Sequence, residues 1–281
     1  MRTNKNITIP GLLILLAILV TGTVSAQDNE ITIPLSNPSE RGKLRVDLNS
    51  GSITVKATSR KDVLLRYREV VNESRDAKNE KNKENTDSNR AGLKRIAGSG
   101  LEIEITEHQN SVTIESGSWS QRLNVELEIP SGFDVFLHTY NNGFLMVTGV
   151  QGALELENFN GKITALNISG SVVATTYNGD IKVTFDKVTP NTPMSYSTFN
   201  GDIELSLPAD YKATIKGKTE QGSIYSDFDI QFRNSGPLQK KEKKGDVFRV
   251  VIDEWKIGDI NGGGAELTMQ NYNGDLIIRK K

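Results

Sequence analysis

The 281-residue sequence contains no cysteine and only two histidines. Without cysteine, the chain can form no disulfide and carries no thiol for a lipid anchor. His108 and His138 stand without a serine or cysteine partner in a triad-like context, so we expect both to be structural or solvated. The sequence therefore predicts no catalytic residues, no metal site and no cofactor, and a fold stabilised by burial and backbone pairing alone.

The sequence also lacks a concentrated excess of positive charge. Lys and Arg number 34 against 35 Asp and Glu, which gives a formal net charge of −1. A nucleic-acid partner would require a basic face, so we expect none. The one basic run, KKEKK at 240–244, is interpreted as a solvated loop, with contact to anionic envelope polymers as the alternative.

Long apolar segments are missing except near the N-terminus, at residues 11–20. Basic residues precede this run and the small residues Val24-Ser25-Ala26 follow it, a pattern typical of a cleaved secretory signal. The run is about half of the ~20 residues that a membrane-spanning helix needs. We therefore predict a signal peptide over 1–26, no transmembrane anchor, and export to the periplasm or to the cell surface or medium.

Glycine, by contrast, recurs with a fixed step of nine residues from Gly143 to Gly179. When glycine is counted as position one, positions three, five and eight are apolar in these units. A straight strand would bury positions three, five and seven, so the parity slips once in every unit and the chain must bend there. Bends at fixed intervals wind a chain into a coil. The pattern predicts a β-solenoid with nine-residue sides, in place of a meander of hairpins.

The period then loosens, and we expect about 18–22 residues per coil through 140–281, with a polar loop at 234–246. Glycine suits a corner because a corner can demand positive φ, which costs any residue with a Cβ about 1–2 kcal/mol. The glycines expected at corners are Gly143, Gly152, Gly161, Gly170, Gly179, Gly201, Gly222 and Gly274.

The N-terminal part shows plain alternation between 99 and 139, which predicts antiparallel strands with turns at 108–111 and 130–132. Such strands would cap the open end of the solenoid. Residues 72–98 include a polar run with almost nothing to bury, and we expect a disordered loop there. The predicted organisation is one elongated all-β domain over 27–281, with strands and cap in 27–139 and coils in 140–281.

Three stretches carry a family resemblance: ELEIPSG at 126–132, the repeated NG corners, and GDIELSLPADYKATI at 201–215. The sequence from about residue 40 to 281 resembles the bacterial "putative adhesin" family of repetitive β-strand domains, a family of unknown function related to head-GIN-type domains. The resemblance implies a secreted or envelope β-solenoid without known enzymatic residues. It implies a role in adhesion or in envelope stress systems, and it supplies no site residues.

The most suggestive candidate site is an aromatic-Asn-Gly triplet that recurs at the corners. Stacked one coil apart, these residues would form an aromatic column beside an asparagine column. One interpretation places the rings in the core and lets the amides bond to one another; the other makes the rings a surface on which sugars or peptide lie against aromatic faces. The residues are Phe159, Asn160, Tyr177, Asn178, Phe199, Asn200, Tyr272 and Asn273.

Two other chemistries find little support. Calcium-binding β-rolls need aspartate in every turn, but the residue after the corner glycine runs Phe144, Ala153, Lys162, Ser171, Asp180. We therefore predict no carboxylate ladder. Glu155 and Glu157 share one side of a strand, but the neighbouring units bring no consistent partner, so a mixed solvated face is the favoured interpretation.

These observations predict a non-enzymatic, exported β-solenoid that serves as an adhesin-like binding or interaction scaffold of the bacterial cell envelope. Its partner would be an envelope polysaccharide or an envelope protein. Two alternatives stay open: a glycan-processing enzyme that uses an exposed solenoid wall, and an accessory factor of an envelope stress system.

Overall fold

The computed structural model describes residues 29–70 and 103–281, apart from 118, 120, 142, 234–237, 245–246 and 254, and it describes only the backbone of 238–253. The predicted signal peptide, the predicted loop at 72–98 and the ends of the predicted loop at 234–246 lie outside the described residues. Within the described ranges all regular structure is β, and no helix there could cross a bilayer.

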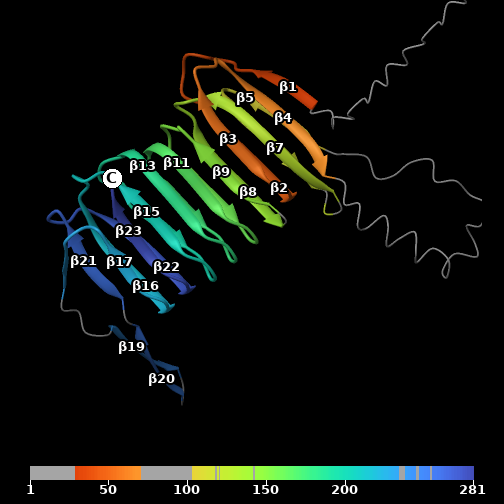
Figure 1. Cartoon of the computed structure of the whole chain (residues 1–281). Coiled ribbons are helices and arrows are strands. Elements are labelled where there is room, and N and C mark those ends of the chain that lie inside the picture. The colour runs from red at the N-terminus through yellow and green to blue at the C-terminus, as the bar shows by residue number, and fades with distance from the viewer. Residues whose placement is uncertain are drawn as a thin grey trace, which may run out of the picture.

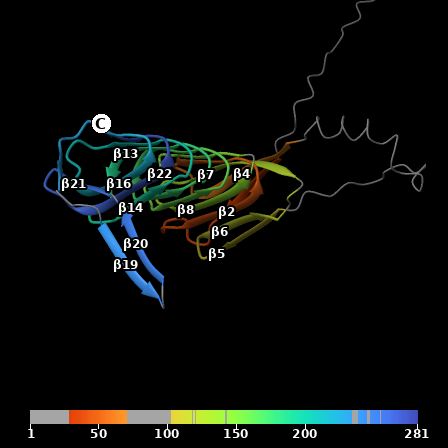
Figure 2. The same cartoon turned by 90° about the horizontal axis from the view of Figure 1, so that it is seen from below.

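Two large sheets face each other and form the walls of a flattened coil (Figures 1 and 2). Wall A contains, in spatial order, β1 (Asn29–Pro34), β4 (Asp62–Val70), β7 (Arg122–Pro130), β3 (Ile53–Thr58), β9 (Leu145–Thr148), β11 (Ile163–Gly170), β13 (Ile181–Val188), β15 (Ile203–Leu207), β23 (Leu276–Lys280) and β17 (Ile224–Ser226). Wall B contains β18 (Ile230–Phe232), β21 (Lys256–Ile260), β16 (Ala213–Gln221), β22 (Ala265–Asn273), β14 (Met194–Ser197), β12 (Val172–Thr175), β10 (Leu154–Asn158), β8 (Asp134–Asn141), β2 (Lys43–Ser50), β6 (Ser111–Ser116) and β5 (Glu104–His108). A separate hairpin, β19 (Leu238–Lys244) with β20 (Val247–Asp253), stands apart from both walls (Figure 1), so the backbone of the basic run at 240–244 forms a strand where a loop was expected.

Neighbouring strands through the middle of each wall are parallel, which confirms a solenoid-like, all-β architecture. In wall B, β10 pairs in parallel with β8 and β12, and in wall A, β11 pairs in parallel with β9 and β13. Successive coils advance by 18 residues from Asn160 to Asn178 and by 22 from Asn178 to Asn200. The chain therefore crosses one wall, turns, crosses the other, and returns one strand further along.

The core is the narrow seam between the walls, and it is filled by positions three and five of the repeat. Every residue in these two columns between 145 and 183 is at most 3% exposed. They are Leu145, Val147, Leu154, Leu156, Ile163, Ala165, Val172, Ala174, Ile181 and Val183. A seam lined in this way is apolar, so each rung is stabilised mainly by apolar burial.

The two kinds of corner differ in which position of the repeat they bury, and the repeat did not predict this difference. Leaving wall A, position eight is buried, as at Ile168, where β11 shifts register against β13 just after Ala165. Leaving wall B, the strand keeps its alternation, so Thr176 at position seven is 3% exposed and Tyr177 at position eight is 43% exposed. The buried set three, five and eight therefore holds for wall A only.

The N-terminal cap is smaller than predicted. β5 and β6 form an antiparallel hairpin around Gln109 and Asn110, whose positive φ values of 50° and 59° make the turn expected there. β7 and β8 do not pair with each other: β7 lies parallel to β3, and β8 lies parallel to β2 and β10. Alternation along a strand reveals only which side chains point inward, and not the direction of the neighbouring strand. Residues 122–141 are therefore part of a coil, and β1, β4 and β5 supply the antiparallel edge.

The coils are not stacked in chain order. β22 lies between β14 and β16 in wall B, and β23 lies between β15 and β17 in wall A. The C-terminal coil is thus inserted between two coils that precede it in the sequence. Near the other end, β2 lies between β6 and β8, and β3 lies between β7 and β9.

Positive φ explains only half of the predicted corner glycines. Gly161, Gly179, Gly201 and Gly274 have φ values of 158°, 156°, 143° and 119°. The others, Gly143, Gly152, Gly170 and Gly222, do not occupy the left-handed region. Their backbones instead approach a neighbouring coil so closely that a Cβ on Gly170 would lie 2.0 Å from the carbonyl oxygen of Gly152. Glycine is needed there for space.

Candidate functional site

The candidate site follows the line where wall B turns into wall A. At this aromatic corner, each of four coils turns through an aromatic residue, an asparagine and a glycine, at 159–161, 177–179, 199–201 and 272–274. A fifth coil contributes Tyr140 and Asn141 at the end of β8. Because the coils are parallel and in register, residues of one kind lie directly above one another.

The five rings form a continuous stack, here named the aromatic ladder. Its members are Tyr140, Phe159, Tyr177, Phe199 and Tyr272. Successive ring centroids are 4.7, 5.1, 4.9 and 4.8 Å apart, and the interplanar angles are between 3° and 8°. Trp119 closes one end edge-on, with its centroid 5.4 Å from that of Tyr140. The insertion of the C-terminal coil places Tyr272 beside Phe199.

The ladder lies on the outside of the corner. Phe159, Tyr177, Phe199 and Tyr272 are 36–43% exposed, so the interpretation that places the rings in the core is wrong. The near-parallel stacking also covers most of both faces of the three inner rings. What the ladder offers to solvent is a strip of ring edges, which carry the positive end of the ring quadrupole, and not a set of open aromatic faces.

The asparagines form the ladder of amide hydrogen bonds that the repeat predicts. Nδ2 of Asn160, Asn178, Asn200 and Asn273 donates to Oδ1 of the asparagine one coil away, at 2.8, 2.8, 2.7 and 2.6 Å. The first acceptor is Asn141. Each inner amide both donates and accepts, so the row is fixed along its length and cannot shift one residue without losing these bonds.

A third row, beneath the rings, was not predicted. Thr139, Asn158, Thr176, Thr198, Asn271 and Thr219 donate side-chain hydrogen bonds of 2.9–3.2 Å to the carbonyls of corner glycines one coil away. The sequence feature that could have revealed this row is a polar residue at position seven of the repeat, two places before the asparagine of each aromatic-Asn-Gly triplet. Threonine satisfies this role with one hydroxyl. Asparagine leaves its Oδ1 without a hydrogen-bond partner at both Asn158 and Asn271, although both are buried.

Beyond the units from which no calcium-binding carboxylate ladder was predicted, aspartates form a short column that bonds to backbone N–H groups. Oδ1 of Asp180, Asp202 and Asp275 each accepts a backbone N–H of the next coil, from Asp202, Asp275 and Ser223 at 3.0, 2.7 and 2.8 Å. The NGD motif, repeated three times in the C-terminal half, was the signal. Among the described residues no group of three or more potential ligands is arranged to hold a metal.

A groove of about 470 Å³ runs beside the aromatic ladder. Rings from four coils line one side, and Thr175, Ser197 and Gln270 from the outer face of wall B line the other. Glu220 is the one charged residue in its lining. The groove crosses the strands and extends parallel to the stack.

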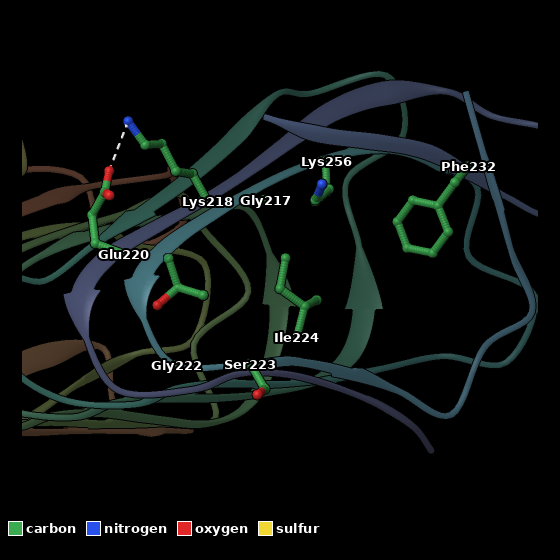
Figure 3. A pocket seen from close by; sticks show the side chains of 9 residues that line it. Gly217, Lys218, Glu220, Gly222, Ser223, Ile224, Phe232 and Lys256 are labelled. Carbon is green, nitrogen blue, oxygen red and sulfur yellow. Dashed lines mark ion pairs between the residues drawn. The ribbon is translucent and has the colours of Figure 1, made fainter. Parts of the chain in front are cut away.

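A second hollow, of about 800 Å³, lies at the end of the stack that is formed by β16, β17, β18 and β21 (Figure 3). Here the inward side of β16 reaches Gly217, against which the side chains of Ile224 and Leu276 pack; a Cβ on Gly217 would lie 3.1 Å from Cδ1 of Ile224. Phe232 stands across the opening and is 57% exposed, and Lys218 pairs with Glu220 at 3.0 Å (Figure 3). The hollow is lined by polar as well as apolar side chains.

Of the remaining candidate residues, Glu157 borders the groove as the register partner of Thr175, and none lines either cavity. Glu155 and Glu157 are exposed on the outer face of β10, and Glu157 lies in register with His138. Nδ1 of His138 is 2.8 Å from Oδ1 of Asp47, which gives this histidine a structural partner. His108 ends β5 and is exposed.

Two facing walls of mostly parallel strands, with stacked side-chain ladders at their corner, define a β-solenoid-like protein of repetitive strands. The sequence matches the Toastrack DUF4097 family over residues 13–261, and the chain therefore belongs to that family. Among solved structures, one similar to it is a "putative cell adhesion protein" from Clostridium sporogenes ATCC 15579, with 12% identity, a TM-score of 0.44, and coverage of 91% of this chain and 100% of that one. Another is a "putative adhesin" from Bacteroides fragilis NCTC 9343, with 9% identity, a TM-score of 0.37, and coverage of 92% and 98%. No curated protein matches the sequence.

Proposed function

We propose that the chain is an exported, non-enzymatic, adhesin-like interaction scaffold of the bacterial envelope, and that the aromatic corner is its contact surface. The observation that carries the proposal is the aromatic ladder, in which four exposed rings continue without interruption from coil to coil. The signal-like residues 1–26 support export, with 27–281 acting as one elongated β domain.

The ladder suits binding because it is exposed, aromatic and already ordered. A continuous apolar strip on a surface that is otherwise polar is a common mark of an interaction site. Stacking and the adjoining amide ladder hold the rings in place before any partner arrives, so that binding costs little additional side-chain entropy. An envelope polysaccharide or an envelope protein would meet the same contacts repeated along the stack.

The alternative of glycan hydrolysis receives less support from the geometry. A hydrolase needs two carboxylates that face each other across the substrate. The groove beside the ladder has Glu220 as its single carboxylate, and this side chain pairs with Lys218. A scaffold accounts for the exposed ladder without requiring such a pair.

The experiment is a retention assay with the mature chain, residues 27–281, against envelope polysaccharide and envelope protein fractions. The test variant carries Tyr177→Ser and Phe199→Ser in the ladder, and the matched control carries Tyr225→Ser. Tyr225 is a 54% exposed aromatic residue of β17, away from the ladder. We expect at least a tenfold loss of retention for the ladder variant alone. Equal retention of the two folded variants would refute the ladder as the contact surface.

A further inference from the structure

The groove beside the aromatic ladder runs across the strands, along the stack axis. Its lining residues come from β10, β12, β14, β22 and the corners that follow them, so it spans four coils, and Glu220 of β16 lies at its end. Four parallel strands at a spacing of ~4.8 Å extend over about 15 Å. A ligand that fills the groove must therefore be elongated and must lie across the strands, along the stack axis.

The groove is also electrically neutral over most of its length, in a chain in which a quarter of the residues are charged. Glu220 lies at the β16 end of the groove and has Lys218 as its partner, 3.0 Å away. A charged polymer would lose hydration there without meeting an opposite charge. The lining therefore favours an uncharged ligand.

The polar groups of the groove match hydroxyl groups better than a peptide backbone. Thr175, Ser197 and Gln270 provide side-chain donors and acceptors on successive coils, and Tyr177 and Tyr272 add phenol groups on the ladder side. The backbone N–H and C=O groups of these strands already bond to the neighbouring strands along the stack axis. A peptide lying across the strands would find no backbone partner for its own N–H and C=O groups.

Tyrosine and phenylalanine alternate along the ladder in the order Tyr140, Phe159, Tyr177, Phe199, Tyr272. Phenol groups consequently recur on every second coil, about 10 Å apart. The intervening phenylalanine edges are suited to the oxygen atoms of a ligand, because the ring edge is electropositive. Phenol groups and electropositive ring edges therefore alternate along the surface, and both can contact the oxygen atoms that recur along a chain of sugar rings.

We propose that this groove binds an uncharged, extended glycan whose chain runs along the stack axis. The inference rests on the proposed function, since it assigns a ligand class to the same surface. Contact is made through ring edges, phenol groups and the side chains of wall B.

The test is calorimetric titration of the folded mature chain with neutral β-1,4-linked glucose and N-acetylglucosamine hexasaccharides, and with the disaccharides of both. A polygalacturonate hexasaccharide serves as the charged probe. We expect at least one neutral hexasaccharide to bind at least tenfold more tightly than its disaccharide and than the charged probe. Equal affinity for the charged probe, or no affinity for either neutral hexasaccharide, would overturn the assignment.

Two single variants locate the site. Thr175→Lys puts a charge into the groove, and Thr164→Lys makes the same change on the outer face of wall A. The first should weaken hexasaccharide binding at least tenfold, and the second should leave it unchanged; equal effects would contradict the site. If both neutral hexasaccharides fail while the ladder still retains an envelope protein, the glycan assignment falls and the proposed function stands. If the chain binds neither the neutral hexasaccharides nor an envelope protein through the ladder, the proposed function is refuted as well.

Discussion

At the scale of single residues, the row beneath the rings shows how the choice between threonine and asparagine affects hydrogen bonding at the corner. Thr139, Thr176, Thr198 and Thr219 each donate a hydroxyl to a corner glycine carbonyl. Threonine is β-branched and favours a strand, and its hydroxyl oxygen lies close to the backbone. Asn158 and Asn271 make the same bond but bury an additional carbonyl oxygen that has no partner.

This difference predicts that Asn158→Thr stabilises the protein. The substitution keeps the donor to the carbonyl of Gly143 and removes the unpaired Oδ1, a gain of about 1 kcal/mol in the free energy of unfolding. The measurement is urea unfolding of the mature chain, with Thr176→Asn as the reciprocal variant, which should lose stability. A loss on Asn158→Thr together with a gain on Thr176→Asn would show that the unpaired oxygen is not the deciding factor.

A second prediction at the residue scale concerns the stability of the fold at low pH. The pKa of Asp259 is lowered below its ordinary value of 3.8, first by the hydrogen bond from Thr214 and then by Arg233. Since the pKa in the folded chain is the lower one, the ionised carboxylate stabilises the fold above pH 3.8, and this contribution is lost as the pH falls through the folded pKa.

Hydrogen exchange should therefore show β21 and the Arg233 end of β18 losing protection on acidification. Asp259→Asn keeps an oxygen to accept from Thr214 but has no charge to pair with Arg233. We expect this variant to exchange faster at neutral pH and to depend less on pH in these strands. Identical pH profiles for the two proteins would contradict the assignment.

At the scale of elements, the units from Gly143 to Val183 follow the nine-residue count, but the count specifies less than the structure contains. The apolar columns at positions three and five predicted the buried seam, and the Asn-Gly corners predicted the amide row. The exposure of Phe159 and Tyr177 was not predictable, because wall B keeps its alternation up to these rings whereas wall A shifts parity at the bulge in β11. The repeat does not distinguish the two walls.

The last element of the ladder gives the next prediction. Thr219 and Gln221 of β16 are in register with Asn271 and Asn273 of β22, which places Glu220 opposite Tyr272. Glu220→Tyr should add a sixth ring to the stack and raise the free energy of unfolding by about 0.5–1.5 kcal/mol. The exposed pair with Lys218 that is lost contributes less than this.

Urea unfolding checks this change, with Glu220→Ala as the control because it removes the same ion pair without adding a ring. The account requires Glu220→Tyr to be the more stable of the two. If the two variants unfold at the same urea concentration, the ladder does not continue onto β16.

At the scale of the whole molecule, the order of the coils decides whether the ladder exists. If the coils were stacked in chain order, β16 would follow β14, and the ring of Phe199 would meet Glu220. Because β22 is inserted between them, Phe199 meets Tyr272 and the ladder continues for another coil. The sequence could not reveal this order, since Leu267 and Met269 of the C-terminal coil fill the same apolar columns as every other coil.

The absence of native cysteine allows a direct test of this order by disulfide trapping. Ser197 of β14 is the Cα partner of Gln270 of β22, which in turn is the partner of Lys218 of β16. Neighbouring strands lie within the ~4.4–6.8 Å between Cα atoms that a disulfide allows, whereas strands two apart do not. Mild oxidation should cross-link Ser197→Cys with Gln270→Cys and leave Ser197→Cys with Lys218→Cys reduced. The opposite result would place β16 beside β14 and would contradict the continuous aromatic ladder on which the binding surface depends.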